Sequence, residues 1–294
     1  MVDILIRKKI LKIQERLGMR IGVIYGTSSI PVVRNVSETL TVLKDLYKIG
    51  VKAFVLPKEL FSDITDASDL YKTKYGDLLK IKEEAKRYNI ELSLRHTELT
   101  EQPDETLKIF SRIAMIMDCR TFIVTPNFYS KIMPKDQALK LAVYKINEIV
   151  SGIEGRVKIG IETTGNINDV GSLEDVIDIV KRTNSTEPII NWAHIHARGA
   201  GILRERKDFG NILNKIKENI GTATLREAYF LFSGISYGPS GEIKHIPVQD
   251  SDLNLEYMIR ESMSMGVRGT LIFEDPERER FILKYMDRLA DMVR

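Results

Sequence analysis

Short apolar runs alternate with longer charged segments along almost the whole chain from Arg20 onward. Eight apolar runs have the length of strands, at 20–25, 52–57, 90–95, 121–125, 157–162, 188–192, 228–232 and 269–274. Their apolar character is nearly continuous, which is typical of parallel strands buried on both faces. Eight segments with the apolar spacing of helices follow them in turn, at 35–49, 77–88, 103–118, 134–151, 172–184, 206–219, 252–265 and 277–293. This alternation predicts βα units around a parallel sheet.

Eight βα units without a Pro- or Ser-rich linker predict one α/β domain, a single (β/α)8 TIM barrel over residues 19–294. The alternative is an open doubly wound sheet. Such a sheet would normally carry a glycine-rich phosphate loop after its first strand, and the sequence GTSS at 26–29 is not that loop. Residues 1–18 predict an additional basic amphipathic helix, which either packs on the barrel or contacts DNA or a partner.

Composition limits the classes of function. The 294 residues carry 44 Lys+Arg and 41 Asp+Glu, and the net charge of +3 is too small to indicate nucleic-acid binding by itself. The single cysteine, Cys119, excludes an intrachain disulfide and a multi-cysteine metal site, and it suits a reducing cytoplasm. We find no signal peptide and no apolar run of membrane-spanning length. We therefore expect a cytoplasmic protein with no membrane partner.

The four histidines of the chain all lie beyond predicted strands. His96 directly follows the third strand, His194 and His196 follow the sixth, and His245 lies in the long loop after the seventh. None falls in a predicted helix. Because the active sites of (β/α)8 barrels lie at the C-terminal ends of the strands, these imidazoles are expected at one barrel mouth.

Two glutamates also end predicted strands. Glu162 closes the fifth strand and Glu274 closes the eighth, where a charge is costly unless it is paired or bound to a metal. Imidazoles and carboxylates at one mouth predict a site for a divalent metal, zinc or manganese. The simpler alternatives are that each glutamate pairs with an Arg or Lys, and that His96 and His196 are ordinary loop residues.

Two loops have the chemistry to bind a phosphate. Arg198 in ARGAG (197–201) is a fixed cation beside glycines, and SGISYGPSG (233–241) offers glycines and backbone N–H groups. Either loop could instead be a plain turn. The chain has no Walker A loop, nucleophile elbow or HExxH motif.

Four segments resemble motifs of the endonuclease IV family, also called AP endonuclease family 2. They are GIETTGN (160–166), NWAHIHARGAG (191–201) in the form of archaeal members, FSGISYGPSGEIKHIP (232–247) and IFEDP (272–276). The resemblance runs from about residue 20 to the C-terminus, and related xylose isomerase-like barrels share its outline. It implies a barrel with three zinc ions that cuts DNA on the 5′ side of an abasic nucleotide.

The resemblance also implies roles for individual residues. The metal ligands that match are His96, Glu162, His194, His245 and Glu274, of which Glu162 and Glu274 are also the candidate catalytic residues. The candidate substrate- or phosphate-binding residues are Asn191, His196, Arg198 and Ser233.

Other ligand positions of that family are substituted in this chain. Thr125 and Leu231 stand where the family has histidines, and Asn191 stands where it has an aspartate. Leucine cannot bind a metal, threonine is a poor zinc ligand, and asparagine lacks the charge. We therefore expect fewer than three ions.

Two further positions depart from the family. Ile243 aligns with a ligand aspartate, for which Glu242 or Asp250 could substitute. Leu99–Thr100 replaces an aromatic-apolar pair, so the wedge that enters DNA is missing.

The sequence thus predicts an endonuclease IV-like DNA-repair protein, a metal-dependent phosphodiesterase acting at abasic sites with a reduced metal site. One alternative is a catalytically silent member that binds DNA or acts as an accessory protein. Another is a sugar or sugar-phosphate isomerase or epimerase with Glu162 and Glu274 as acid–base groups around one metal. A closed pocket between opposed glutamates would favour the isomerase, and an open basic groove would favour DNA.

Overall fold

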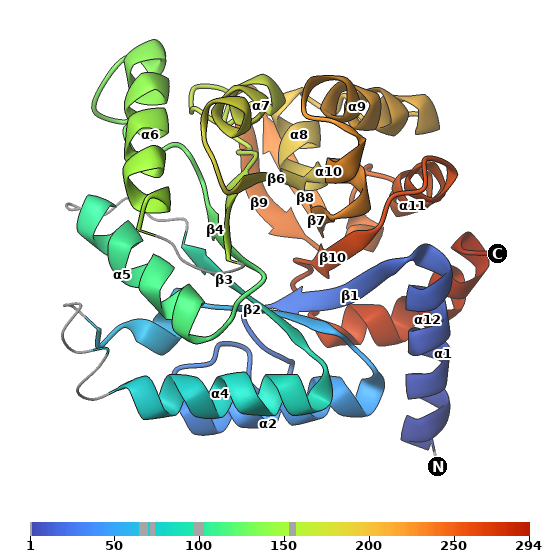
Figure 1. Cartoon of the computed structure of the whole chain (residues 1–294). Helices are drawn as coiled ribbons and strands as arrows, with labels where there is room; N and C mark the ends of the chain where they lie inside the picture. Colours follow the sequence, from blue (N-terminus) through green and yellow to red (C-terminus); the bar gives the residue numbers. More distant parts are fainter. Residues whose placement is uncertain (1, 65–69, 71–73, 97–102, 153–156) are drawn as a thin grey trace.

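Eight parallel strands close into a barrel in the order β1-β10-β7-β6-β5-β4-β3-β2 (Figure 1). The computed structural model describes residues 2–64, 70, 74–96, 103–152 and 157–294. The barrel strands are β1 (Met19–Ile24), β2 (Ala53–Leu56), β3 (Glu91–His96), β4 (Thr121–Val124), β5 (Lys158–Glu162), β6 (Thr186–Asn191), β7 (Ala228–Phe232) and β10 (Gly269–Phe273). Each overlaps one predicted apolar run, so the predicted (β/α)8 barrel is confirmed.

The outer layer consists of helices that follow the strands along the chain. They are α2 (Val36–Ile49), α4 (Tyr75–Tyr88), α5 (Pro103–Ile116), α6 (Lys135–Val150), α7 (Leu173–Arg182), α9 (Arg206–Asn219), α11 (Leu255–Ser264) and α12 (Glu279–Met292). Ser172 caps α7 in a capping box with Asp175, which explains why that helix begins where the sequence predicts.

The N-terminal helix α1 (Val2–Leu17) packs on the outside of the barrel, against α2 and α12 (Figure 1). Ile10, Ile13 and Leu17 are buried in the main hydrophobic core. The Gln14 side chain accepts a hydrogen bond from the backbone of Ile21 at 2.8 Å and donates one to the carbonyl of Gly50 at 2.8 Å. The helix predicted over residues 1–18 is therefore part of the packed structure, and a contact between it and DNA stays a prediction.

Alternate residues of the strands point into the barrel or out towards the helices, as the two-residue period of a strand requires. The inward residues form a separate apolar cluster of Ile24, Ala53, Val55, Ile123, Ile189, Tyr229, Leu231 and Ile272. At the C-terminal end of the strands this apolar filling gives way to buried charged and amide side chains. That polar layer forms the floor of the barrel mouth.

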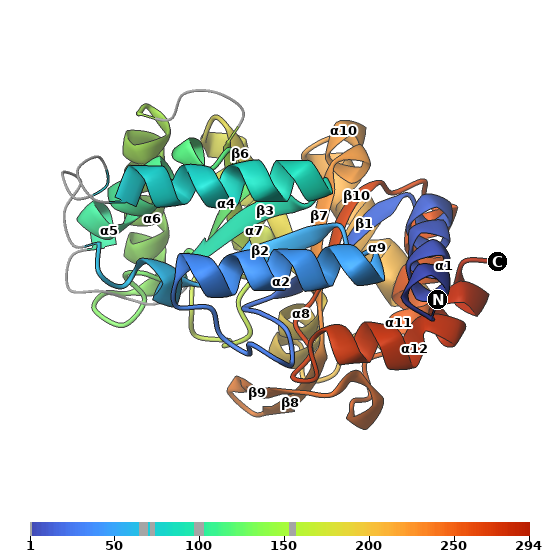
Figure 2. The same ribbon diagram turned by 90° about the horizontal axis from the view of Figure 1, so that it is seen from below.

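Several short elements lie where the sequence predicts loops. They are the helices α8 (Trp192–Arg198) and α10 (Thr222–Arg226), the 3-10 turns η1 (Lys58–Phe61) and η3 (Val248–Asp250), and an antiparallel hairpin of β8 (Gly234–Gly238) and β9 (Gly241–Ile246). The hairpin lies against α8 and stands out from the barrel (Figure 2). These elements have too few residues for a periodic pattern, so they escape sequence prediction.

These elements correct the predicted placement of three histidines. His194 and His196 lie on α8 rather than in a loop, and His245 lies on β9. Within the residues that the structure describes, none of the helices is long and apolar enough to cross a membrane.

Candidate metal site and ionic floor of the barrel mouth

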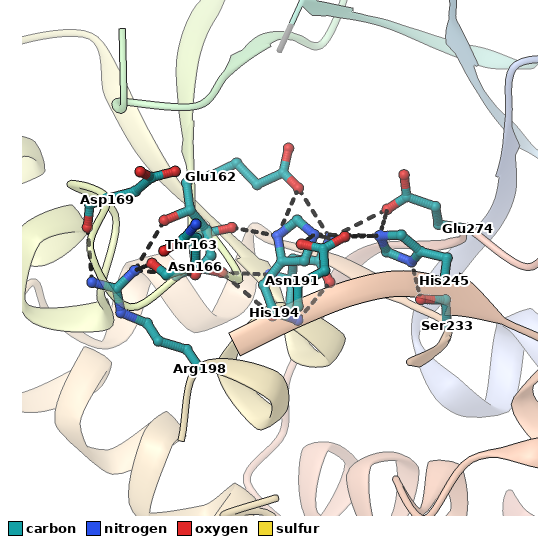
Figure 3. Close-up of polar contacts among 12 residues, drawn as sticks. Glu162, Thr163, Asn166, Asp169, Asn191, His194, Arg198, Ser233, His245 and Glu274 are labelled. Atoms are coloured by element: carbon teal, nitrogen blue, oxygen red, sulfur yellow. Dashed lines mark hydrogen bonds and ion pairs between the residues drawn. The ribbon is translucent and has the colours of Figure 1, made fainter. Parts of the chain in front are cut away.

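Four of the five predicted metal ligands lie together at the barrel mouth (Figure 3). His194 on α8 is 3.5 Å from Glu162 at the end of β5, measured from Nδ1 to Oε1. The Nε2 atoms of His194 and His245 are 3.4 Å apart, and His245 Nε2 is 3.9 Å from Glu274 Oε2. The convergence expected from the strand ends is thus present for these four.

The fifth predicted ligand, His96, points to the other side of its strand. Its ring packs edge-on against Phe110 of α5, with ring centroids 4.6 Å apart. The residue before it, Arg95, points into the barrel instead, because neighbouring strand residues face opposite sides. The structure therefore corrects the predicted role of His96, and sequence analysis missed Arg95 as the inward residue.

Arg95 forms a buried ionic cluster with the two glutamates. Its Nε donates to Glu162 Oε2 at 2.9 Å and its Nη2 donates to Glu162 Oε1 at 2.6 Å, while Nη1 donates to Glu274. The three side chains are between 0 % and 7 % exposed, so water hardly screens these interactions. We call Arg95, Glu162, Glu274 and the neighbouring Asn191 the Arg95 cluster.

Asn191 completes this cluster as a neutral donor. Its Nδ2 lies 3.0 Å from Glu162 Oε1 and 3.2 Å from Glu274 Oε2, so the amide bridges both carboxylates. Its Oδ1 accepts the backbone N–H of His194 and caps α8. That cap fixes which way the amide faces.

The opposite charges in the Arg95 cluster keep Arg95 and Glu274 ionised. Burial alone would lower the pKa of Arg95, but the carboxylates of Glu162 and Glu274 outweigh it and raise that pKa well above its usual value. Burial would likewise raise the pKa of Glu274, and Arg95 outweighs it and holds the pKa well below the usual range. A carboxylate held this way is a weak base, which weakens the predicted acid–base role of Glu274.

A second group, which we call the rim triad, lies beside the cluster. It consists of His194, Glu242 and His245, whose ligand atoms all lie within 4.8 Å of one another. Glu242 Oε2 is 3.2 Å from His194 Nε2, and Glu242 Oε1 is 3.2 Å from His245 Nε2. The Glu242 and His245 side chains are 27 % and 21 % exposed, so the triad opens to solvent.

Both imidazoles of the rim triad are held through their other ring nitrogen. His194 Nδ1 lies 2.6 Å from the carbonyl oxygen of Thr163, and His245 Nδ1 bonds the hydroxyl of the buried Ser233. Because a carbonyl only accepts, Nδ1 of His194 carries a proton, and the neutral form of this ring has its lone pair on Nε2. Such an outer partner orients an imidazole for metal binding.

Glu242 reaches the triad because the hairpin lies directly on the loop after β5. Its backbone N–H donates to the carbonyl of Gly165 at 3.0 Å, and Asn166 pairs with Gly241 across the same junction. Both glycines at this junction leave room for the contact. A Cβ on Gly165 would overlap the Glu242 carboxylate, and a Cβ on Gly241, whose φ is 99°, would overlap the carbonyl oxygen of Gly165. Sequence analysis named Glu242 only as a possible substitute, since nothing in the chain shows this contact.

The electrostatics of the triad follow from its three members. Burial alone would lower the pKa of His245, but the carboxylates of Glu274 and Glu242 raise it above its ordinary value. Burial would raise the pKa of Glu242, and the two histidines lower it instead. The triad therefore holds a carboxylate beside imidazoles, the donor set of many divalent-metal sites.

Two predicted phosphate-binding residues have other partners. Arg198 Nη1 donates to Thr164 Oγ1 at 3.1 Å and Nη2 donates to the carbonyl of Asp169 at 2.8 Å, with further backbone carbonyls of the same loop around it (Figure 3). His196 is fully buried, and its Nε2 is 3.0 Å from Asp252 Oδ1. Arg198 thus organises the loop after β5, and His196 ties α8 to the segment after the hairpin.

The structure also places the positions at which this chain differs from the endonuclease IV motifs. Leu231 is fully buried in the apolar filling of the barrel, and Thr125 is buried just beyond β4. Ile243 is 64 % exposed on the hairpin. Leu99–Thr100 lies outside the residues that the structure describes.

Tyr25 is a further mouth residue that sequence analysis missed. It follows β1 with a φ of 70°, a conformation that non-glycine residues adopt rarely. Its hydroxyl accepts from Arg95 Nη1 at 3.3 Å and lies 3.4 Å from Glu274 Oε1. Backbone strain of this kind concentrates at functional sites.

Comparison with known proteins agrees with the barrel fold. A model of the xylose isomerase-like TIM barrel family matches residues 43–292. The chain belongs to this family. A relative at 24 % identity over 268 residues, covering 90 % of this chain and 95 % of its own, is an uncharacterised protein of Methanocaldococcus jannaschii.

Several solved structures resemble the chain in fold. A D-tagatose 3-epimerase-like protein has a TM-score of 0.64 at 16 % identity, with 94 % of this chain and 97 % of the other covered. The IolI protein with a bound zinc atom has a TM-score of 0.59 at 14 % identity, with 94 % and 95 % covered. These likenesses show the fold, and neither structure is an endonuclease IV.

Proposed function

We propose that this family member is a single-metal enzyme of the sugar isomerase or epimerase class. The ion is held by the rim triad of His194, Glu242 and His245. The observation that carries the proposal is that these three side chains converge while both histidines are anchored through Nδ1.

The donor set fits a divalent ion such as zinc or manganese. Two imidazole nitrogens and one carboxylate leave coordination positions open, as catalytic sites do. A bound ion would supply a Lewis acid that polarises a carbonyl or hydroxyl oxygen of the substrate. The chain's own contribution is to hold a proton on Nδ1 of His194, to orient His245 through Ser233, to place a carboxylate at the solvent side, and to give the site an ionic floor.

The charges at the mouth favour a neutral substrate over DNA. Glu162, Glu274 and Glu242 face a single guanidinium there, and the loop cation Arg198 is engaged with backbone carbonyls. A polyanion would meet carboxylates where phosphate binding requires cations. A neutral sugar carries hydroxyl groups that can bind both the ion and the carboxylates, and the neighbour named as epimerase-like is of the same class.

An endonuclease IV-like metal centre would require side chains that have other partners in this barrel mouth or are replaced there. Glu162 and Glu274 are bound to Arg95, His96 packs against α5, and position 231 is apolar filling. Abasic-site cleavage is therefore less well supported than the isomerase or epimerase class, and its assay is the second one in the experiment below.

The experiment combines metal analysis with two activity assays. Purified chain is loaded with zinc or manganese, its metal content is measured, and ketopentoses and ketohexoses are followed by NMR in D2O for exchange and conversion. Glu242→Gln removes a ligand, and Lys244→Ala, an exposed neighbour on the same hairpin, is the matched control. We expect one ion per chain and sugar exchange, both lost in Glu242→Gln and kept in the control.

The other outcomes overturn specific parts of the proposal. Cleavage of an abasic duplex with three ions per chain would restore the endonuclease reading. One ion per chain without exchange or conversion of any ketose would refute the substrate class. An unchanged metal content in Glu242→Gln would refute the rim triad as the metal site.

A further inference from the structure

The two strand-end glutamates of the mouth converge on one point, and a side chain of the protein lies between them. Glu162 comes from β5 and Glu274 follows β10, and both carboxylates contact the Arg95 guanidinium. Glu162 is fully buried and Glu274 is 7 % exposed. Two buried carboxylates in contact with one centre require a cation there, because their charges would otherwise be uncompensated.

We propose that Arg95 is a built-in replacement for a divalent ion, so that its guanidinium covers a latent metal site formed by Glu162 and Glu274. This inference does not rest on the proposed function, because it concerns the floor of the mouth and not the rim triad.

The contacts leave both carboxylates fully used. Arg95 binds both oxygens of Glu162 in the two-point geometry that suits a planar guanidinium. One oxygen of Glu274 receives Arg95, and the other receives the Asn191 amide at 3.2 Å. A divalent ion could bind these oxygens only after the guanidinium had left.

Charge arithmetic explains why an amide stands at position 191. One guanidinium, two carboxylates and one amide carry a formal net charge of −1. A carboxylate at position 191 would make that −2, and only a divalent cation in place of Arg95 would restore −1. Arg95 and Asn191 therefore match each other: a single positive charge suffices because the side chain at position 191 is neutral and donates hydrogen bonds to both carboxylates.

A consequence is that the cation between Glu162 and Glu274 is present without any metal supply. Chelators would empty the rim triad and leave the floor of the mouth intact. Tyr25, whose hydroxyl accepts from Arg95 at 3.3 Å, helps to hold the guanidinium in place.

The test removes the guanidinium in a chain whose rim triad is already disabled. The parent is Glu242→Gln, and the test variant adds Arg95→Ala. The matched control adds Arg120→Ala instead. Arg120 also binds a buried glutamate, Glu187, with Nη1 2.9 Å from both carboxylate oxygens, but that glutamate has Lys158 as a second cation. Binding of Mn²⁺ is followed by electron paramagnetic resonance and by the shift in melting temperature.

We expect the Arg95→Ala variant to take up one Mn²⁺ per chain, at least 10-fold tighter than the parent, and to melt at a higher temperature with Mn²⁺ than without. Adding Asn191→Asp should tighten binding at least another 10-fold. The parent and the Arg120→Ala control should take up no ion of comparable affinity. Equal Mn²⁺ binding in the Arg95→Ala variant and its parent would overturn the proposal.

If the Arg95→Ala variant does not fold in metal-free buffer, refolding from denaturant gives the same decision. The yield of folded chain should then depend on Mn²⁺ in the Arg95→Ala variant and not in the Arg120→Ala control. A yield that ignores Mn²⁺ would overturn the proposal. Because the rim triad is disabled throughout, failure of this test leaves the proposed function untouched.

Discussion

The guanidinium of Arg95 and the carboxylate of Glu162 form a two-point ion pair inside the barrel, with Nε 2.9 Å from Oε2 and Nη2 2.6 Å from Oε1. This pair closes the floor of the mouth and leaves the neighbouring rim triad as the accessible group of metal-binding side chains.

Breaking that pair should cost far more stability than breaking an exposed one. Glu162→Gln leaves Arg95 buried with one carboxylate fewer, and we expect a loss of about 3 kcal/mol in the free energy of unfolding. Urea denaturation measures it. Glu256→Gln is the control, because it breaks an exposed Arg260–Glu256 pair at 2.7 Å and should cost less than about 1 kcal/mol. Equal losses would mean that the Arg95 cluster contributes no more than a surface pair.

Gly165→Ala should weaken metal binding without unfolding the barrel. The added methyl group would lie 2.6 Å from Cβ of Glu242, and because a Cβ moves only with its backbone, the hairpin must shift at Glu242 and displace the carboxylate. We expect a loss of about 10- to 100-fold in affinity for zinc, by titration calorimetry, as when an outer partner of a metal ligand is changed. Gly76→Ala, where an added methyl group meets nothing within 4 Å, should leave the affinity unchanged. The same affinity in both variants would contradict the assignment of Glu242 as a ligand.

Restoring a histidine at position 231 should destabilise the protein instead of rebuilding a metal centre. Leu231 is fully buried among apolar side chains, and an imidazole there would lack a partner. We expect Leu231→His to lose about 3 kcal/mol in a denaturant titration, and Leu231→Met, which conserves volume, to lose less than about 1.5 kcal/mol. A stable Leu231→His chain that gains an ion would show that the barrel filling can open.

The start of α7 should make stability depend on acid pH. Burial alone would raise the pKa of Asp175, but the backbone N–H groups of Gly171 and Ser172, together with Lys135, hold the pKa below its usual value. A carboxyl group whose pKa is lower in the folded chain binds fewer protons there than in the unfolded chain. Its contribution is therefore complete above the unfolded value of about 3.9 and is lost as the pH falls through the folded value.

We expect Asp175→Asn to cost about 1 kcal/mol near neutral pH, and the difference from the unmodified chain to shrink below about pH 4. Unfolding titrations between pH 3 and pH 7 measure this. Asp178→Asn, on the same helix in an exposed pair with Arg182 at 2.8 Å, should show no such trend. A difference that stays constant with pH would refute the role of the Asp175 charge.

The barrel itself could be predicted from the sequence because its strands and helices are long enough to carry a periodic pattern. The two glutamates could be placed at strand ends for the same reason. At the end of β3 the pattern fails, because Arg95 and His96 are both polar and nothing in the chain shows which one faces inward. In the structure Arg95 faces inward, because it pairs with Ile123 of β4, which belongs to the apolar cluster inside the barrel.

His194 and His245 of the rim triad were predicted as ligands, but the place of Glu242 beside them could not be predicted, for a different reason. Glu242 belongs to a hairpin that meets the loop after β5 through long-range backbone contacts, from the Glu242 N–H to the Gly165 carbonyl and between Asn166 and Gly241. Contacts of that kind leave no local signal in the sequence. At Arg198 a local signal is present but misleading. A cation beside glycines suggests a phosphate site, whereas the Arg198 side chain donates to backbone carbonyls of the loop after β5.

Anomalous X-ray scattering from crystals of the zinc-loaded chain tests the central claim most directly, because it locates each ion among the side chains. The account predicts one peak per chain, within bonding distance of His194 Nε2, His245 Nε2 and the Glu242 carboxylate, with Arg95 still bound to Glu162 and Glu274. A peak between Glu162 and Glu274, with the Arg95 guanidinium displaced, would contradict it.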